Sequence, residues 1–264
     1  MPHEPYIPHN SMYFHFACVL VFLLLGAVST WSILAHQPDG RLHLHLVSAG
    51  DESALFLRTP SGQTLLFDPG KEVNEISAAV GAELSPWSHQ VDAVWLSSRT
   101  YARNLSGLAE RLPLRSVILP PVVYRTGADT KPLEIPDGVD PVKLQPGSAV
   151  EYSPDLSVRV VAESYESAAL LITHGAVKIL IPNGVDFAQI RSADPALLSG
   201  VSVLVLNESD ISYIPPRVWQ GLEPRQVLWN SPAVTPVDSW QGPREAGHIH
   251  LISDGNNLFL PSRP

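Results

Sequence analysis

The chain has 264 residues, of which 45% are hydrophobic and 16% are charged, so it can bury a full core in one domain of about 220 residues after an N-terminal segment. Seventeen basic and 26 acidic residues give a formal charge of −9, which opposes binding along a phosphate backbone and argues against nucleic acid as a partner. The single cysteine, Cys18, lies in an apolar run, which excludes a disulfide framework and a cysteine metal site.

The chain opens with a polar leader, residues 1–11, which contains three prolines and has no regular period. Residues 12–34 are apolar, and the stretch from Ala17 to Val28 carries no polar side chain. About 22 residues of helix span roughly 33 Å, which is enough for the hydrocarbon core of a bilayer. Tyr13 and Trp31 lie near the two ends, where amphipathic aromatic residues favour the membrane interface. The sequence therefore predicts one transmembrane helix over residues 12–34.

A cleaved signal peptide is the alternative interpretation of this segment. No Lys or Arg precedes Arg41, so the positive leading region of a signal peptide is missing, and no clean small-x-small cleavage site follows. The pattern therefore favours an uncleaved anchor. The same lack of basic residues leaves the membrane orientation open.

Residues 42–70 carry the pattern of three strands with a tight hairpin. Leu42, Leu44 and Leu46 alternate with more polar neighbours, and residues 55–57 and 64–67 are short apolar runs rich in strand formers. Between these two runs, Pro60-Ser61-Gly62 provides a fixed φ followed by a residue that is free to take a positive φ, which predicts a turn.

This stretch resembles the opening of the metallo-β-lactamase fold, and more closely that of the hydrolase-like domain of ComEC-type competence channels. That opening contains the elements D-V-G-Q-G-D-A, R-T-P-S-G and D-G-G, each after a strand. Residues 58–62 read R-T-P-S-G without change, and Asp68 and Gly70 follow the next strand. Residues 48–53 read S-A-G-D-E-S in place of the first element. The residues that build the scaffold are thus kept, whereas polar residues that serve the active site are replaced.

The resemblance implies the fold of the whole domain. We expect an α/β protein over residues 41–264, a four-layer αββα sandwich of two mixed sheets with helices outside. The two halves are expected to meet near residues 130–150, with the Pro- and Gly-rich stretch 127–147 as their connection. The resemblance also implies that the domain faces outward from the membrane, on the periplasmic or extracellular side.

The next segment covers the position where active relatives carry their metal ligands. The spacing predicts a helix over residues 71–83 and a buried strand over residues 91–96. In active relatives such a strand ends in H-x-H-x-D-H, whose side chains converge on one or two metal ions. Aligned on the Gly107-Leu108 end, the four ligand positions here hold Arg99, Tyr101, Arg103 and Asn104. An arginine cannot be deprotonated in a protein and cannot bind a metal.

The second half shows similar replacements. Residues 156–161, 168–173, 177–181 and 203–206 are predicted strands. At the place of the family's bridging aspartate the chain reads Pro182-Asn183-Gly184, with Asp186 close behind, and Glu208 stands at the place of the late histidine. Residues 247–255 resemble the last strand pair.

Two histidine pairs leave a relocated metal site open as an alternative. His43 and His45 are two apart on a strand and share a face, as do His248 and His250, so the four rings could meet. The first strand of this fold does not supply metal ligands, and no Asp or Glu is spaced with either pair. We therefore expect solvent-facing histidines and no metal, no cofactor and no catalytic residue.

The sequence thus predicts a pseudoenzyme. We expect a non-enzymatic, membrane-anchored domain that acts as a structural or scaffolding subunit of a larger membrane complex, such as a photosynthetic or respiratory one. A hydrolase with a non-standard metal site and an accessory domain of a DNA-uptake system are the alternatives. The candidate contact residues are the former ligand positions, namely Arg99, Tyr101, Arg103, Asn104 and Glu208.

Overall fold

The computed structural model describes residues 10–35, 37–49, 52–70, 72–84, 90–125, 132–145, 147–193, 195–196, 198–207, 210, 222–229 and 248–260. Contacts divide the chain into two units, one containing residues 1–37 and 85–87 and the other residues 38–84 and 88–264. We describe each unit by itself.

The first unit contains helix α1, Asn10–Ala35. Its central 19 residues, Tyr13–Trp31, are long and apolar enough to cross a membrane. The helix predicted over residues 12–34 is therefore confirmed as a helix. A signal sequence near an N-terminus would have the same length and composition.

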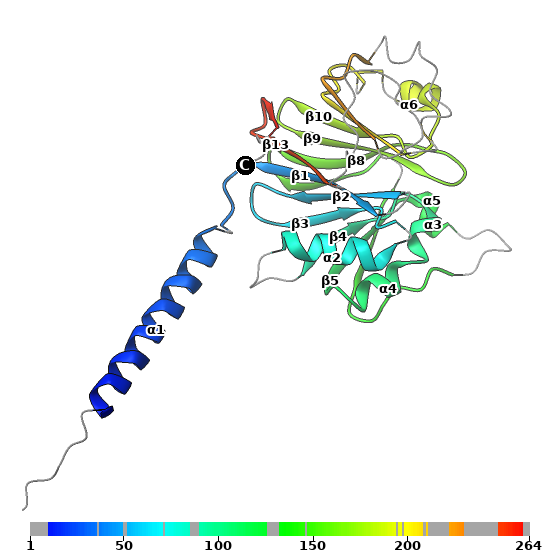
Figure 1. Ribbon diagram of the computed structural model, residues 1–264. Coiled ribbons are helices and arrows are strands. Elements are labelled where there is room, and N and C mark those ends of the chain that lie inside the picture. The colour runs from blue at the N-terminus through cyan, green and yellow to red at the C-terminus, as the bar shows by residue number, and fades with distance from the viewer. Residues whose placement is uncertain are drawn as a thin grey trace, which may run out of the picture. The chain divides into compact units, whose positions relative to one another are not determined.

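The second unit contains two mixed β-sheets (Figure 1). The first sheet has eight strands in the order β14-β13-β1-β2-β3-β4-β5-β6. Their bounds are Leu42–Ala49 (β1), Glu52–Arg58 (β2), Thr64–Phe67 (β3), Val91–Trp95 (β4), Leu114–Leu119 (β5), Asp140–Lys143 (β6), His248–Ser253 (β13) and Leu258–Phe259 (β14). The predicted hairpin joins β2 to β3, and Gly62 takes a φ of 88° in its turn, as the Pro-Ser-Gly sequence predicts.

The second sheet has six strands in the order β12-β11-β10-β9-β8-β7. Their bounds are Ala149–Ser153 (β7), Leu156–Glu163 (β8), Ala168–His174 (β9), Val177–Ile181 (β10), Val203–Leu206 (β11) and Gln226–Trp229 (β12). Strands β7 to β10 are antiparallel neighbours, whereas β10, β11 and β12 run parallel. The four strands predicted in this half are all present.

Helices cover the outer faces of both sheets. Helices α2 (Val73–Glu83), α3 (Arg99–Ala102), α4 (Leu105–Ala109) and α5 (Pro121–Tyr124) lie against the first sheet, and α6 (Phe187–Ala193) lies against the second (Figure 1). Three apolar clusters fill the spaces between these four layers: one between the sheets and one beneath the helices on each side. The αββα sandwich expected from the sequence is therefore confirmed.

Side chains on both faces of β1 are buried, because successive residues of a strand point to opposite faces of the sheet. Leu42, Leu44 and Leu46 point into the core between the sheets, whereas Val47 belongs to the core beneath α2. A strand buried on both faces is expected where helices cover one side and a second sheet covers the other.

The connection between the halves is shorter than predicted. Strand β6 lies inside the stretch 127–147 that we expected to be a linker, and it pairs in parallel with β5 from Ser116↔Asp140 to Leu119↔Lys143. The first half therefore extends to Lys143. The sequence does not predict β6, because its side chains are exposed and it contains Pro141. Prolines and polar residues are tolerated in a strand at the edge of a sheet.

Candidate functional site

Four strands of the two sheets end beside one another at the edge of the sandwich. Strand β3 leads into Asp68, β4 into Ser97, β10 into Asn183 and β11 into Asn207. Because β3 and β4 are parallel, as are β10 and β11, each pair of carboxyl ends meets at one edge of its own sheet. This strand-end region is the candidate site that the topology itself creates.

Asp68 links the two sheets at this edge. Its side chain is buried, and its Oδ1 accepts a hydrogen bond from the backbone N–H of Ser97 at 2.6 Å. Its Oδ2 accepts a bond from Nδ2 of Asn183 at 3.3 Å, and the same amide nitrogen lies 3.3 Å from the carbonyl oxygen of Ala168. Both carboxylate oxygens are thus held by N–H donors, one from each sheet.

Backbone strain accompanies these contacts. Asp68 has a φ of 47° and Asn183 a φ of 52°, values in the left-handed region where Asp and Asn are the most tolerated side-chain-bearing residues. The two residues therefore occupy conformations that few other residue types would adopt, and their side chains are fixed at the junction of the sheets.

The predicted ligand positions are dispersed. Tyr101 lines the small cavity at the strand ends, whereas Asn104 donates from Nδ2 to the carbonyl oxygen of Gly70 at 2.7 Å. Arg103 is exposed, and Arg99 is half-buried at the start of α3. Glu208 lies outside the described residues. The structure brings only Tyr101 of this set into the cavity.

The strand-end cavity itself is small. Its volume is about 30 Å³, which leaves room for one or two water molecules. Its lining residues are Leu46, Leu55, Phe67, Asp68, Tyr101, Ile181, Asn183, Val205, Leu206 and Asn207.

The residues around this cavity do not fit the metal that the resemblance implies at the strand ends. A catalytic zinc site uses three protein ligands, typically imidazoles, carboxylates or thiolates. Among the lining residues that the structure describes, the only side chain of these types is Asp68, and both of its oxygens accept hydrogen bonds from N–H groups.

Asp210 is a buried carboxyl that the sequence reasoning passed over. Its side chain is 2% exposed. Its Oδ1 accepts a short hydrogen bond from the backbone N–H of Gly184, and its Oδ2 accepts one from the N–H of Asn207 at 2.9 Å. Burial raises the pKa of Asp210 to about 6, although the two backbone hydrogen bonds act in the opposite direction. Asp210 therefore joins the ends of β10 and β11.

This raised pKa predicts a pH-dependent stability. A carboxyl whose folded pKa lies above its ordinary value of 3.8 favours folding below that value and loses this contribution as pH rises toward 6. Relative to Asp210→Asn, the wild-type free energy of unfolding should therefore fall by up to about 3 kcal/mol between pH 3.5 and 6.5. Urea unfolding of both proteins across this range measures the difference, and parallel pH profiles would contradict the assignment.

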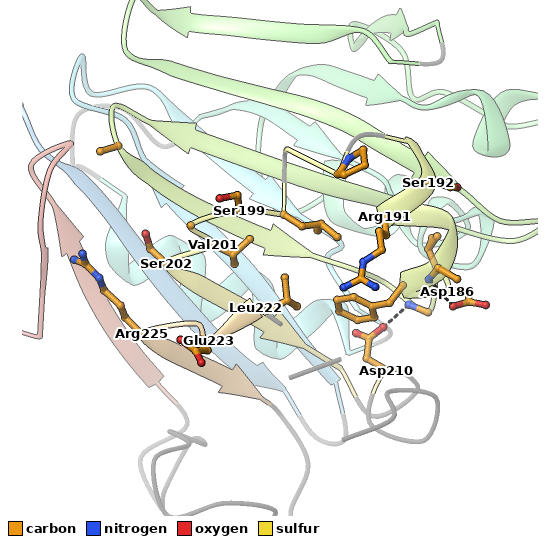
Figure 2. A pocket seen from close by; sticks show the side chains of 18 of the residues that line it. Asp186, Arg191, Ser192, Ser199, Val201, Ser202, Asp210, Leu222, Glu223 and Arg225 are labelled. Carbon is orange, nitrogen blue, oxygen red and sulfur yellow. Dashed lines mark hydrogen bonds between the residues drawn. The ribbon is translucent and has the colours of Figure 1, made fainter. Parts of the chain in front are cut away.

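A larger hollow lies beside α6 on the outer side of the second sheet (Figure 2). Its volume is about 1330 Å³, and Asp186, Arg191, Asp210 and Arg225 are among its lining residues. Oδ1 of Asp186 accepts a hydrogen bond from the N–H of Ala188 at 2.8 Å. Asp186, which the sequence left open as a substitute for the bridging aspartate, therefore binds the backbone at the start of α6 and does not line the strand-end cavity.

Three histidines meet at a second place in the molecule. His43, His45 and His250 each offer a ring nitrogen within 4.8 Å of the others. His45 is buried, with 6% of its surface exposed, so the expected solvent-facing position is wrong for this residue. The side chain of His248 lies outside the described part of the structure.

No family model and no curated protein matches the sequence. Among solved structures, the metallo-β-lactamase fold protein YhfI from Bacillus subtilis matches with a TM-score of 0.50 at 13% identity, over 72% of this chain and 86% of that chain. Zn²⁺-bound PqqB from Methylobacterium extorquens matches with a TM-score of 0.47 at 15% identity, over 62% and 72% of the two chains. Human tRNase Z, short form, matches with a TM-score of 0.44 at 11% identity, over 72% and 91%. The chain, by its layers, its strand order and its likeness to YhfI, has the metallo-β-lactamase fold.

Proposed function

We propose that this protein is a non-enzymatic binding or scaffolding subunit of a larger membrane assembly. The observation that carries the proposal is the strand-end cavity of about 30 Å³. A substrate pocket normally has a volume of about 300–1,000 Å³, an order of magnitude larger.

The contacts around the cavity support a structural role for this edge. Asp68 binds groups from both sheets, Asn104 binds the carbonyl of Gly70, and Tyr101 occupies part of the space. Asp68 and Asn104 are thus hydrogen-bonded to neighbouring groups, and the described residues place no set of metal-binding side chains around the cavity. The alternative of a hydrolase at this edge lacks such a set.

The contact surface that we propose lies beside this edge. Ser98 pairs with Ser167 in an isolated bridge, and the turn before Ser167 carries Tyr165, whose surface is 96% exposed. Arg99 follows Ser98 directly, and Arg103 is exposed one helical turn later. Tyrosine and arginine are the residue types enriched at the energetic centres of protein interfaces.

The overall charge argues against the DNA-uptake alternative. A formal charge of −9 repels a phosphate backbone, and the two arginines of this surface are too few to reverse that field. A protein partner is therefore the occupant that this surface favours.

We further propose that α1 anchors the protein and that the domain faces the periplasmic or extracellular side. If so, the full-length protein should stay in the membrane fraction through carbonate and high-salt washes and should be released by detergent, because burying about 20 apolar residues is effectively irreversible. Release by carbonate would contradict anchoring, and a mature protein that begins after residue 30 would identify a signal peptide.

Charge reversal tests the contact surface. In gently solubilised membranes, the wild-type protein should migrate above the mass of its 28.7 kDa monomer with a partner in fixed ratio. In the double variant Arg99→Glu, Arg103→Glu, the amount of partner that co-purifies should fall by tenfold or more. Reversed charges at an interface act on binding more than on folding. The matched control is Arg159→Glu, an exposed arginine of β8.

Two results would contradict the proposal. One is a wild-type protein that is monomeric in every mild detergent. The other is partner loss in the Arg159 control as well. If the double variant melts far below the wild type, the arginines support the fold, and Tyr165→Ala then serves as the test of the same surface.

A further inference from the structure

We propose that His43, His45 and His250 form a zinc site on the outer face of the first sheet, where the ion joins the closing strand β13 to β1. The site is separate from the strand-end cavity, and the proposal does not depend on the proposed function. It replaces our expectation from the sequence that the protein binds no metal.

The strand register brings the three rings together. His43 and His45 lie two residues apart on β1 and so share a face of the sheet. Strand β13 pairs antiparallel with β1, and His250 lies directly opposite His45 in that pairing. Directly opposed residues of antiparallel strands have Cβ atoms about 5 Å apart on the same face, which is the spacing that a shared metal ion requires.

The face is identified by the neighbours of His45. Its ring packs against that of Phe56, which belongs to the apolar cluster beneath α2. Oε2 of Glu83, at the end of α2, lies 3.7 Å from Nδ1 of His45. The histidines therefore lie on the helix-covered side of the sheet, opposite to the core between the sheets.

The ring nitrogens are close to the geometry of a tetrahedral zinc site. Nδ1 of His43 lies 3.0 Å from Nε2 of His250. Two nitrogens bound to one zinc at about 2.0–2.1 Å with a tetrahedral angle would lie roughly 3.4 Å apart. The three rings are also close, with centroids 4.1 Å apart for His45 and His250 and 5.2 Å apart for His43 and His250. The rings are stacked, with interplanar angles of 13° for His45 and His250 and 25° for His43 and His250, so binding an ion requires them to turn until their lone pairs converge on it.

Asp39 fixes the form of His43 that binds metal. Nε2 of His43 lies 3.0 Å from both oxygens of the Asp39 carboxylate, so this nitrogen carries the proton and donates it. The lone pair then lies on Nδ1, the nitrogen that faces His250. Metal-binding histidines almost always donate their other ring N–H to such a carboxylate or carbonyl group.

Two acidic side chains lie next to the histidines. Asp39 is 3.0 Å from His43, and Glu83 is 3.7 Å from His45. They provide carboxylate oxygens near a bound dication.

The histidine cluster is largely shielded from water. His45 is 6% exposed, and 21% of the His43 side chain is exposed. A zinc ion bound here would contact a ring nitrogen of each histidine.

The consequence is a clamp at the start of the domain. Asp39 lies in the segment between α1 and β1, His43 and His45 lie on β1, and His250 comes from β13, far along the chain. Zinc would tie the first and the closing strands of the first sheet together.

Zinc titration of the purified full-length chain in detergent tests the site. After treatment with chelator, the wild type should take up one Zn²⁺ per chain, and its Tm should rise by about 5–10 °C when free zinc reaches 100 times Kd. Co²⁺ in its place should give the visible absorption of a tetrahedral complex. His45→Ala and His250→Ala should each weaken zinc binding by roughly 100-fold or more, because a protein ligand is removed.

Two further variants distinguish zinc binding at this site from a loss of stability and from zinc binding elsewhere in the chain. Asp39→Asn should weaken zinc binding by about 10–100-fold while the metal-free Tm stays close to that of the wild type, because this carboxylate is 47% exposed and acts through His43. His15→Ala, which changes a histidine of α1, should leave zinc binding unchanged.

The proposal is overturned if the wild type binds no stoichiometric zinc, or if His45→Ala and His250→Ala bind it as tightly as the wild type. It is also overturned if zinc raises the Tm of Asp39→Asn, His45→Ala and the wild type equally. If a histidine variant fails to fold, the zinc affinity of Asp39→Asn is the test, and an affinity equal to that of the wild type overturns the proposal.

Discussion

Replacing Asp68 by alanine is expected to lower the free energy of unfolding by about 3–4 kcal/mol. The change leaves the buried N–H of Ser97 and the amide of Asn183 without their carboxylate acceptor, and each loss of such a partner costs about 1–3 kcal/mol. It also places alanine at a φ of 47°, which costs about 1 kcal/mol or more. Chemical denaturation of the two proteins measures the difference.

Asp68→Asn is the matched control. Asparagine tolerates the left-handed backbone and can still accept from Ser97, but its own amide nitrogen would face that of Asn183. We expect a loss of about 1–2 kcal/mol, roughly half of the alanine effect. If alanine costs less than the asparagine variant, Asp68 does not hold the sheets together and the carboxylate is kept for another reason.

The second large effect is expected at Trp95, in the core between the sheets. Its side chain is fully buried, its ring stacks on Phe67 with centroids 5.8 Å apart, and its Nε1–H donates to the hydroxyl of Tyr152 at 2.7 Å. Tyr152 belongs to β7 of the second sheet, so this bond crosses between the sheets. Trp95→Ala should lower the free energy of unfolding by about 3–5 kcal/mol, because it removes a large buried side chain and leaves a cavity.

Trp95→Phe separates packing from hydrogen bonding at the same position. It keeps an aromatic ring but loses the N–H donor, so we expect a loss of about 1–2 kcal/mol. Burial, as the main cause, and the charge of Asp92 raise the pKa of Tyr152 to about 12, while the bond from Trp95 opposes them. The phenylalanine variant should therefore raise this pKa further. A Trp95→Ala protein that unfolds with the wild-type midpoint would contradict the inter-sheet core described above.

The sequence predicts the scaffold because its strands are strongly patterned. The alternation from Leu42 to Val47 and the turn at Gly62 give the first hairpin, and the apolar run from Val177 to Ile181 marks a central strand. Such signals are local, and a neighbouring sheet only reinforces them. The sequence carries no such signal for β6, because all four of its side chains are exposed at the edge of the sheet.

The candidate sites depend on contacts that local patterns do not contain. The spacing of His43 and His45 predicts a shared face, but only the register between β1 and β13 places His250 opposite His45. Asp210 carries no motif, and its role follows from the fold of two distant strand ends. The positions of the four residues aligned with metal ligands also depend on tertiary contacts, which their spacing in the sequence does not contain.

An assay of hydrolysis by the purified full-length protein decides whether the strand-end edge is an active site. Phosphodiester, thioester and lactam substrates are supplied with and without added Zn²⁺ or Mn²⁺, and rates are compared for the wild type, Asp68→Asn and Asp254→Asn, an exposed carboxylate outside the strand-end edge. All three proteins should give the rate of the metal solution alone, because the described residues hold no catalytic set at the strand-end edge. Metal-dependent turnover by the wild type and by Asp254→Asn that Asp68→Asn abolishes would contradict this expectation, because the strand-end edge would then be an active site.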